Sequence, residues 1–147
     1  MPFRFSDCRT VPVDAVMALY THAVWAKDRT TDQTREVLER SSLVASLWES
    51  DRMIAFARVM TDFIFRAAIY DVIVHPDRRN CGAGHQLIDA LLDHPRLVRV
   101  PTFHLLTRDK RAFYEKRGFV IAAQAGLDTL ILTRDTPSSV LPINRSC

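Results

Sequence analysis

A glycine-containing turn at residues 79–84 stands between an apolar run and an amphipathic run, and its residue types suit a phosphate. A strand that turns directly into a helix leaves the first backbone N–H groups of the helix unpaired and directed at one place. Gly82 and Gly84 lack a Cβ, so the backbone can approach a ligand closely. Arg78 and Arg79 add fixed positive charge. The turn predicts a polyanionic ligand, although an ordinary strand-to-helix turn can carry the same glycines.

Spacing excludes two nucleotide-binding motifs for this turn. A dinucleotide fingerprint needs a third glycine three residues after the second, where this chain has Leu87. A P-loop ends in Gly-Lys-Ser or Gly-Lys-Thr, where this chain has Gly84-His85-Gln86. The turn therefore belongs to neither class of nucleotide site.

Two segments, taken together, resemble the GNAT superfamily of N-acetyltransferases. Residues 74–87 read Val-His-Pro-Asp-Arg-Arg-Asn-Cys-Gly-Ala-Gly-His-Gln-Leu, which is similar to the strand valine, proline, Arg/Gln-x-x-Gly-x-Gly/Ala turn and apolar helix of that family. Residues 111–119 read Arg-Ala-Phe-Tyr-Glu-Lys-Arg-Gly-Phe and resemble the short helix and Tyr-Glu-Lys-x-Gly-Phe turn that follow in the family. Each segment alone is weak, but the order and separation of the two are specific.

The resemblance implies a fold and a cosubstrate. The fold would be of the mixed α/β class, with a mostly antiparallel mixed sheet that splays open between its fourth and fifth strands and is flanked by helices. Acetyl-CoA would enter that gap. The family's pantetheine-binding strand corresponds to Val72, Ile73 and Val74, and its pyrophosphate-binding turn corresponds to Arg79, Asn80, Cys81, Gly82, Ala83 and Gly84. Asn80 and Cys81 replace the glycine and lysine that are frequent in the family, which is tolerable where backbone N–H groups make the contacts.

Acetyl transfer to an amine requires a neutral amine, a thioester within reach and a proton for the departing thiolate. Tyr114 aligns with the tyrosine that the family places beside the coenzyme A sulfur, so the resemblance assigns it as the general acid. A phenol with an ordinary pKa near ~10 stays protonated at neutral pH and can donate. The alternative is a core tyrosine that packs against Phe113 and Phe119.

The general base is less clearly indicated. Asp71 interrupts an otherwise apolar strand, where a carboxylate must be paired or face a wet cleft. It is a candidate base, and the alternative is a structural Asp paired with an arginine. His104 is the rival, because a neutral imidazole accepts protons near pH 7. Ordered water is the third possibility, and we rank Asp71 above His104.

The acceptor side of the site is expected at the junction of the first two helices. Residues 25–29, Trp-Ala-Lys-Asp-Arg, combine an aromatic ring with mixed charge, which suits a small polar acceptor or a helix end packed on the core. With residues 57–62 and 107–109, this segment resembles a subgroup of small bacterial GNAT proteins. That subgroup has histidine and glycine where this chain has Arg111 and Ala112.

Hydrophobic periodicity and turn residues predict alternating helices and strands in the order that the GNAT fold requires. We expect helices at 12–25, 31–40, 85–94 and 109–117. We expect strands at 3–5, 43–48, 53–60, 69–74 and 103–107, with closing strands at 119–122 and 129–133. Residues 1–134 would form a single domain, and the Pro/Ser-rich residues 135–147 would form a tail.

The length, composition and net charge of the chain exclude several classes of protein. The 147 residues are 48% hydrophobic and 25% charged, enough for one core. The absence of a long apolar run predicts no membrane span, and three widely spaced cysteines suit a reducing compartment such as the cytoplasm. The net charge of +3 comes from 17 arginines and 3 lysines that are scattered, so nucleic acid is not expected. The histidines lack paired ligand spacing, so no metal is expected.

The sequence therefore predicts an acetyl-CoA-dependent N-acetyltransferase. The acceptor would be a primary amine of a small molecule, peptide or protein, and a homodimer is plausible for this family. Two alternatives remain open: a GNAT-fold protein that binds acetyl-CoA without turnover, and an acyltransferase that uses a longer acyl-CoA.

Overall fold

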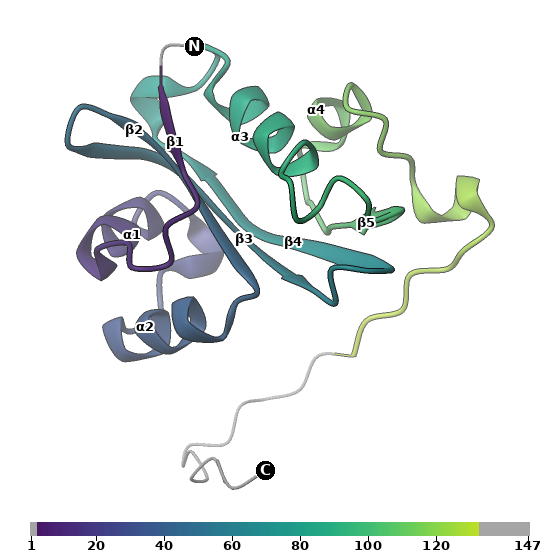
Figure 1. Ribbon diagram of the computed structural model, residues 1–147, viewed down its shortest axis with the longest axis horizontal. Helices are drawn as coiled ribbons and strands as arrows, with labels where there is room; N and C mark the ends of the chain where they lie inside the picture. Colours follow the sequence, from purple (N-terminus) through teal and green to yellow (C-terminus); the bar gives the residue numbers. More distant parts are fainter. Residues whose placement is uncertain (1–2, 133–147) are drawn as a thin grey trace, which may run out of the picture. The chain divides into compact units, whose positions relative to one another are not determined.

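The computed structural model describes residues 3–132 (Figure 1). The chain divides into two compact units, Met1–Arg108 and Asp109–Cys147. The first unit contains a five-stranded sheet with the order β1-β2-β3-β4-β5, and the second contains α4 (Arg111–Glu115) and a short 3-10 turn, η3 (Ala122–Ala125). The single domain expected for residues 1–134 stays a prediction.

The sheet is mixed and mostly antiparallel, as expected. Its strands are β1 (Arg4–Ser6), β2 (Leu43–Glu49), β3 (Arg52–Thr61), β4 (Arg66–Val74) and β5 (Thr102–His104). The first four strands pair antiparallel in sequence order, and β5 adds to β4 in parallel. The middle strands are buried on both faces because helices cover both faces, which explains their nearly continuous apolar sequence.

The splay between the fourth and fifth strands is confirmed. β5 pairs with β4 only through Arg66, Ala67 and Ala68, at the start of β4. β4 continues for six more residues, to Val74, with β3 as its partner on the other side. Within residues 3–132, the second half of β4 therefore has no strand neighbour on the β5 side.

Helices pack on opposite faces of this sheet (Figure 1). On one face lie α1 (Val13–Tyr20) and α2 (Thr31–Arg40), and on the other lies α3 (Ala83–Leu92). A core cluster joins the buried side of α1 to the sheet through Val16, Leu19, Tyr20, Phe56 and Ile73. Burial of such side chains supplies about 1.5–3 kcal/mol each. This packing fixes the face of β4 on which the polar groups described below gather.

Three of the elements differ from those expected. α1 ends at Tyr20 instead of continuing to residue 25, because the chain turns at Thr21 and the next large apolar residues, Val24 and Trp25, are exposed and offer no continuing core face. The expected closing strand at 119–122 is wrong, since residues 122–125 form η3. The expected strand at 129–133 is also wrong over its described part, residues 129–132, which have no strand partner there.

A capping box begins α2 and was not expected from the sequence. The Thr30 hydroxyl accepts from the Gln33 N–H at 3.1 Å, and the Gln33 side chain accepts from the Thr30 N–H at 2.9 Å. Two backbone donors that the helix cannot satisfy are thereby paired. The box also fixes the direction of the chain at Arg29, the residue immediately before it.

We predict that Thr30→Ala lowers the free energy of unfolding by about 1 kcal/mol, because one helix-start donor loses its acceptor. Urea unfolding of the purified protein measures the change. Thr31→Ala is the matched control, since Thr31 is the first helical residue and makes no capping bond. Equal losses in the two variants would mean that the capping box does not stabilise α2.

Candidate functional site

The connection from β4 to α3 has the shape expected of a phosphate-binding turn. After Val74 the chain forms a short 3-10 turn, η2 (Pro76–Arg78), and reaches α3 through Asn80 and Gly82, both with left-handed backbone angles, φ 60° and 87°. Gly82 is the N-cap of α3, and its carbonyl accepts the helix's first bond, from the Gln86 N–H at 2.9 Å. The N–H groups of Ala83 and Gly84 precede that bond, so no helical carbonyl can pair with them. Such a helix start attracts anions.

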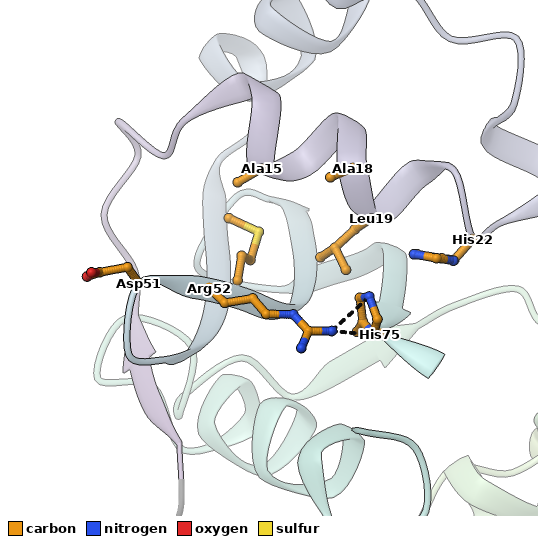
Figure 2. Close-up of a pocket in the computed structure, with 8 residues that line it drawn as sticks. Ala15, Ala18, Leu19, His22, Asp51, Arg52 and His75 are labelled. Carbon is orange, nitrogen blue, oxygen red and sulfur yellow. Dashed lines mark hydrogen bonds between the residues drawn. The ribbon is translucent and has the colours of Figure 1, made fainter. Parts of the chain in front are cut away.

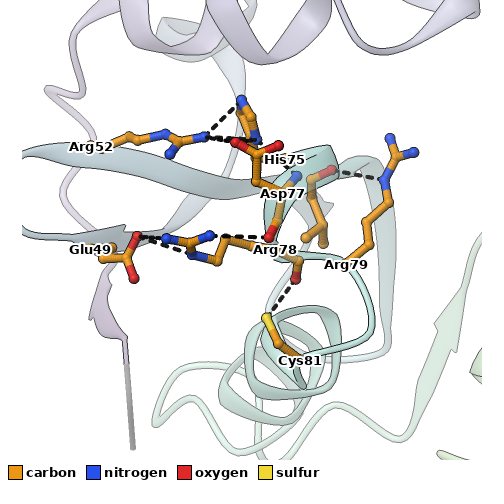
Figure 3. A network of polar contacts seen from close by, with 8 residues as sticks. Glu49, Arg52, His75, Asp77, Arg78, Arg79 and Cys81 are labelled. Carbon is orange, nitrogen blue, oxygen red and sulfur yellow. Dashed lines mark hydrogen bonds and ion pairs between the residues drawn. The ribbon is translucent and has the colours of Figure 1, made fainter.

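The two adjacent arginines of this connection have different environments (Figure 3). Arg78 donates to the Glu49 carboxylate at 2.6 and 3.0 Å, which ties the turn to the end of β2. Among the described residues Arg79 makes one bond, from its Nε to the Val74 carbonyl at 3.2 Å, and Figure 3 shows its guanidinium directed away from the Glu49 pair. Arg78 is therefore structural, and Arg79 is the cation available to a ligand.

Cys81 makes a hydrogen bond inside the same turn. Its thiol donates to the Arg78 carbonyl at 2.7 Å (Figure 3). The residue thus acts as a small polar cap of the turn. The structure brings together, on consecutive segments, the residues that sequence reasoning assigned to acetyl-CoA: Val72, Ile73, Val74, Arg79, Asn80, Cys81, Gly82, Ala83 and Gly84.

Asp71 lies at an irregularity in β4. The pairing with β3 shifts between Phe56 and Arg58, so β4 contains an extra residue there, and Asp71 has φ 57°. A β-bulge of this kind redirects side chains. It places the Asp71 carboxylate on the face covered by α1 and α2, where its side chain is only 5% exposed.

Three side chains, from α1, from β3 and from the connection between α1 and α2, bond this carboxylate. Arg29, between α1 and α2, donates to both oxygens at 2.5 and 3.1 Å. Arg58 of β3 donates from Nε at 2.8 Å, and the Tyr20 hydroxyl of α1 donates at 3.0 Å. A buried carboxylate needs this degree of pairing. The alternative of a structural Asp paired with arginine therefore describes these contacts.

The protonation states of this cluster follow from its contacts. Burial by itself would raise the pKa of Asp71, but hydrogen bonds and charge from Arg29 and Arg58 outweigh burial and hold that pKa below its ordinary value. Burial and the nearby Asp71 carboxylate raise the pKa of Tyr20 to about 12. Asp71 is therefore ionised and Tyr20 neutral at physiological pH, and an Asp with a lowered pKa accepts protons poorly.

Aromatic rings flank the two arginines. The Arg29 guanidinium lies over the rings of Tyr20 and Trp25, at 5.0 and 5.1 Å from their centroids, and that of Arg58 lies 5.0 Å from the ring centroid of Tyr70. These are cation–π distances. The sequence had marked Trp25, Arg29 and the segment 57–62, which contains Arg58, but it did not predict that Arg58 and Tyr70 form one cluster with Asp71. The sequence did contain a signal for the cluster, because Arg58 and Asp71 are ionisable residues within the apolar sequences of two adjacent strands, β3 and β4.

Tyr114 lies in the second compact unit, Asp109–Cys147. It is buried in α4, and its ring packs edge-on against Phe113 and Phe119, at centroid distances of 4.9 and 5.8 Å. Burial raises the pKa of Tyr114 to about 12. The phenol is therefore protonated at neutral pH and can donate a hydrogen bond.

His104, the rival base, ends β5 and pairs in register with Ala68.

A separate cavity of about 340 Å³ lies between α1 and the start of β3 (Figure 2). Ala15, Ala18, Leu19 and Met53 supply its apolar lining, and His22, Asp51, Arg52 and His75 supply its polar lining. An Arg52 nitrogen contacts both ring nitrogens of His75 at 2.8 and 2.9 Å. Burial and the Arg52 charge lower the pKa of His75, so this imidazole stays neutral at pH 7.

Residues 3–132 contain neither a membrane-spanning helix nor a cluster of metal ligands. No helix in this part of the chain is long and apolar enough to cross a membrane. No group of three or more His, Cys, Asp or Glu side chains is arranged there to hold a metal ion. The expectation that the protein needs no metal stays a prediction.

Comparison with solved structures first identifies the class of protein. A putative acetyltransferase of the GNAT family from Xanthomonas campestris superposes with a TM-score of 0.76 and 27% identity, over 92% of this chain and 94% of that one. The sequence model of the acetyltransferase (GNAT) domain matches residues 40–121, more than half of the chain. The chain therefore belongs to the GNAT family.

Curated relatives are similar over part of their length. An uncharacterized N-acetyltransferase, ycf52, of Porphyra purpurea is 34% identical over 101 residues, covering 65% of this chain and 58% of that protein. Serotonin N-acetyltransferase 2, chloroplastic, of Oryza sativa is 30% identical over 105 residues, covering 66% and 51%. This chain thus spans little more than half the length of these relatives.

We predict that Asp71→Asn lowers the free energy of unfolding by about 3 kcal/mol at pH 7, because Arg29 and Arg58 lose their shared counter-ion. The wild-type advantage should be present above the ordinary Asp pKa of 3.8 and should be lost as the pH falls through the lower folded pKa. Urea unfolding at a series of pH values measures it.

The exposed Asp28→Asn variant is the matched control for this series and should show little change. A wild-type advantage that already fades near pH 6 would contradict the pKa direction. It would mean that the pKa of Asp71 is raised, as a general base requires.

Proposed function

We propose that this protein is an acetyl-CoA-dependent N-acetyltransferase that transfers an acetyl group to a primary amine by direct attack within a ternary complex. One observation carries the proposal: the second half of β4, which within residues 3–132 has no strand neighbour on its β5 side, leads into the turn and helix start at Gly82. An extended thioester arm can pair with the free strand edge while its pyrophosphate reaches the helix start. Membership of the GNAT family supports this cosubstrate.

In this proposal the backbone does most of the binding. The N–H groups at Gly82, Ala83 and Gly84 meet the pyrophosphate oxygens, and the Arg79 guanidinium adds a charge-assisted contact. Backbone groups of Val72, Ile73 and Val74 bond the pantetheine amides and hold the thioester carbonyl. Side-chain identity at Asn80 and Cys81 matters less than the left-handed backbone that Asn80 and Gly82 provide.

The chemical step forms one C–N bond and breaks one C–S bond. The neutral amine attacks the thioester carbonyl carbon, and the resulting tetrahedral adduct collapses with the electron pair leaving on sulfur. The Tyr114 hydroxyl then donates its proton to the thiolate, an assignment that depends on the resemblance of residues 111–119 to the family motif. The raised pKa of Tyr114 keeps its hydroxyl protonated at neutral pH until the thiolate forms, and water returns the proton to the phenolate after the transfer.

The proton lost by the amine goes to ordered water in this proposal. Asp71 is ionised but strongly stabilised by two arginines, so it holds Arg29 and Arg58 in place instead of accepting the proton itself. His104 lies on β5 and pairs in register with Ala68, which precedes Asp71 by three residues on β4. It remains the rival base.

The acceptor is proposed to be a primary amine on a small molecule, peptide or protein. Serotonin, which the rice relative is named for, is a primary amine and is compatible with this class. A cytoplasmic location and a homodimer stay predictions from the sequence. Binding without turnover and preference for a longer acyl-CoA are outcomes that the following experiments distinguish.

We predict that acetyl-CoA, and not ATP or NAD, raises the melting temperature of the purified protein. At about 100 times Kd, a ligand that binds only the folded state adds about 2.7 kcal/mol of stability. This corresponds to several degrees for a chain of this size. Equal shifts with all three compounds would mean that the turn is only nonspecifically basic.

Variants sharpen this measurement. Arg79→Met should weaken acetyl-CoA binding about tenfold, because a charge-assisted bond is lost. Arg40→Met is the matched control, since Arg40 bonds Glu36 on α2, away from the turn. Equal affinities of the Arg79 variant and wild type would remove Arg79 from the proposed site.

We predict that Tyr114→Phe lowers kcat by about 100-fold while the Kd of acetyl-CoA stays within twofold, because only the proton donor is lost. Coenzyme A release, followed with a thiol reagent, gives kcat, and calorimetry gives Kd. Phe119→Leu controls for packing, because it alters the ring contact with Tyr114 but leaves the hydroxyl. Unchanged turnover in the Tyr114 variant would reject the acid assignment.

A further inference from the structure

The cluster around Asp71 carries more positive than negative charge. Two guanidinium groups, from Arg29 and Arg58, share one carboxylate, and the third partner, Tyr20, is neutral. One positive charge is therefore left without a counter-ion among the groups in contact. Partly buried charge of this kind is costly unless an anion completes it, because water solvates it only in part.

The unused donors of this cluster belong mainly to Arg58. Its Nε bonds Asp71, and within residues 3–132 its two terminal nitrogens bond no protein acceptor. These nitrogens are not among the buried unpaired atoms of that part of the chain, and the side chain is 17% exposed, so they reach the surface. A guanidinium offers up to five donors in a planar fork, and a carboxylate is a natural partner for the free pair.

Two half-exposed rings stand beside the arginines. Trp25 is 47% exposed and Tyr70 is 41% exposed, each within cation–π distance of one guanidinium. Exposed aromatic faces beside a fixed charge provide apolar contact for the body of a small molecule and a polar anchor for one end. All of these residues lie in the first unit, so the arrangement does not depend on how the second unit sits.

We infer that the acceptor amine carries a carboxylate, which the terminal nitrogens of Arg58 bind, while its apolar or aromatic body lies against Trp25 and Tyr70. Asp71 orients Arg58 through the Nε bond and fixes Arg29 through two bonds. A carboxylate matches the cluster because its single negative charge equals the single charge left over, whereas a phosphate would overcompensate it. This inference rests on the proposed N-acetyltransferase function.

Matched pairs of amines test the inference directly. Phenylalanine and phenethylamine differ only in the α-carboxylate, and 6-aminohexanoate and pentylamine differ only in a carboxylate distant from the amine. With acetyl-CoA present, the carboxylate-bearing member of at least one pair should have a kcat/KM about tenfold or more above that of its partner, the size of a charge-assisted bond. A third pair, phosphoethanolamine and ethanolamine, tests whether the site prefers a phosphate, and it is called the phosphate arm.

A binding measurement covers the case in which turnover is slow. Calorimetric titration of the full chain, loaded with coenzyme A, with N-acetylphenylalanine and N-acetylphenethylamine should show the same preference. Arg58→Lys keeps the charge and the fold but removes the planar fork, so it should reduce the preference to about threefold or less. Arg35→Gln, on the exposed side of α2, should leave it unchanged.

The outcomes separate this inference from the proposed function. Acetyl-CoA binding with equal affinities or rates for both members of every pair would overturn the carboxylate site and leave the acetyltransferase intact. A preference confined to the phosphate arm would also overturn it. Failure to bind acetyl-CoA would overturn both, and a preference that survives Arg58→Lys and Arg58→Gln would show that the carboxylate binds elsewhere.

Discussion

The buried carboxylate of Asp71 is the constraint on which the packing of α1, the segment before α2 and β3 around the middle of β4 depends. An ionised group that is almost wholly removed from water must be neutralised by its neighbours. Here the neighbours come from α1, from the segment before α2 and from β3, so one charge fastens three elements to the middle of β4. The bulge that aims Asp71 at these partners has a strained left-handed residue, and the three-sided pairing stabilises that backbone.

The cosubstrate side depends on a different constraint, the early end of the pairing between β4 and β5. Three residue pairs hold β5 in place, after which β4 keeps its extended form through its bonds to β3 alone. Its other edge then has no strand partner among residues 3–132, and such an edge invites an extended ligand. β4 thus contributes to both parts of the proposed site. Its edge on the β5 side would bind the thioester, and its bulge at Asp71 positions the two arginines of the proposed acceptor side.

The parts that the sequence predicted are those encoded locally. The helix starts, the hairpin turns and the glycine turn are set by residues a few positions apart, and the family motifs span short segments. The Asp71 cluster is not local, because Arg29 and Arg58 are 42 and 13 residues away, and nothing in a short window shows that they meet. The closing strands failed for a related reason: apolar, β-branched residues at 129–132 favour extension, but a strand also needs a partner that the described residues do not supply.

The bond between Arg78 and Glu49 has a further consequence. It clamps the turn before α3 to the end of β2, a strand that no ligand has to touch. The turn is thereby held in one shape in advance, so the proposed binding of a polyanion there would cost little conformational entropy. Of the two adjacent arginines, Arg78 holds the turn in place and Arg79 is the one proposed to contact the ligand, and exchanging these roles would require a different partner at the end of β2.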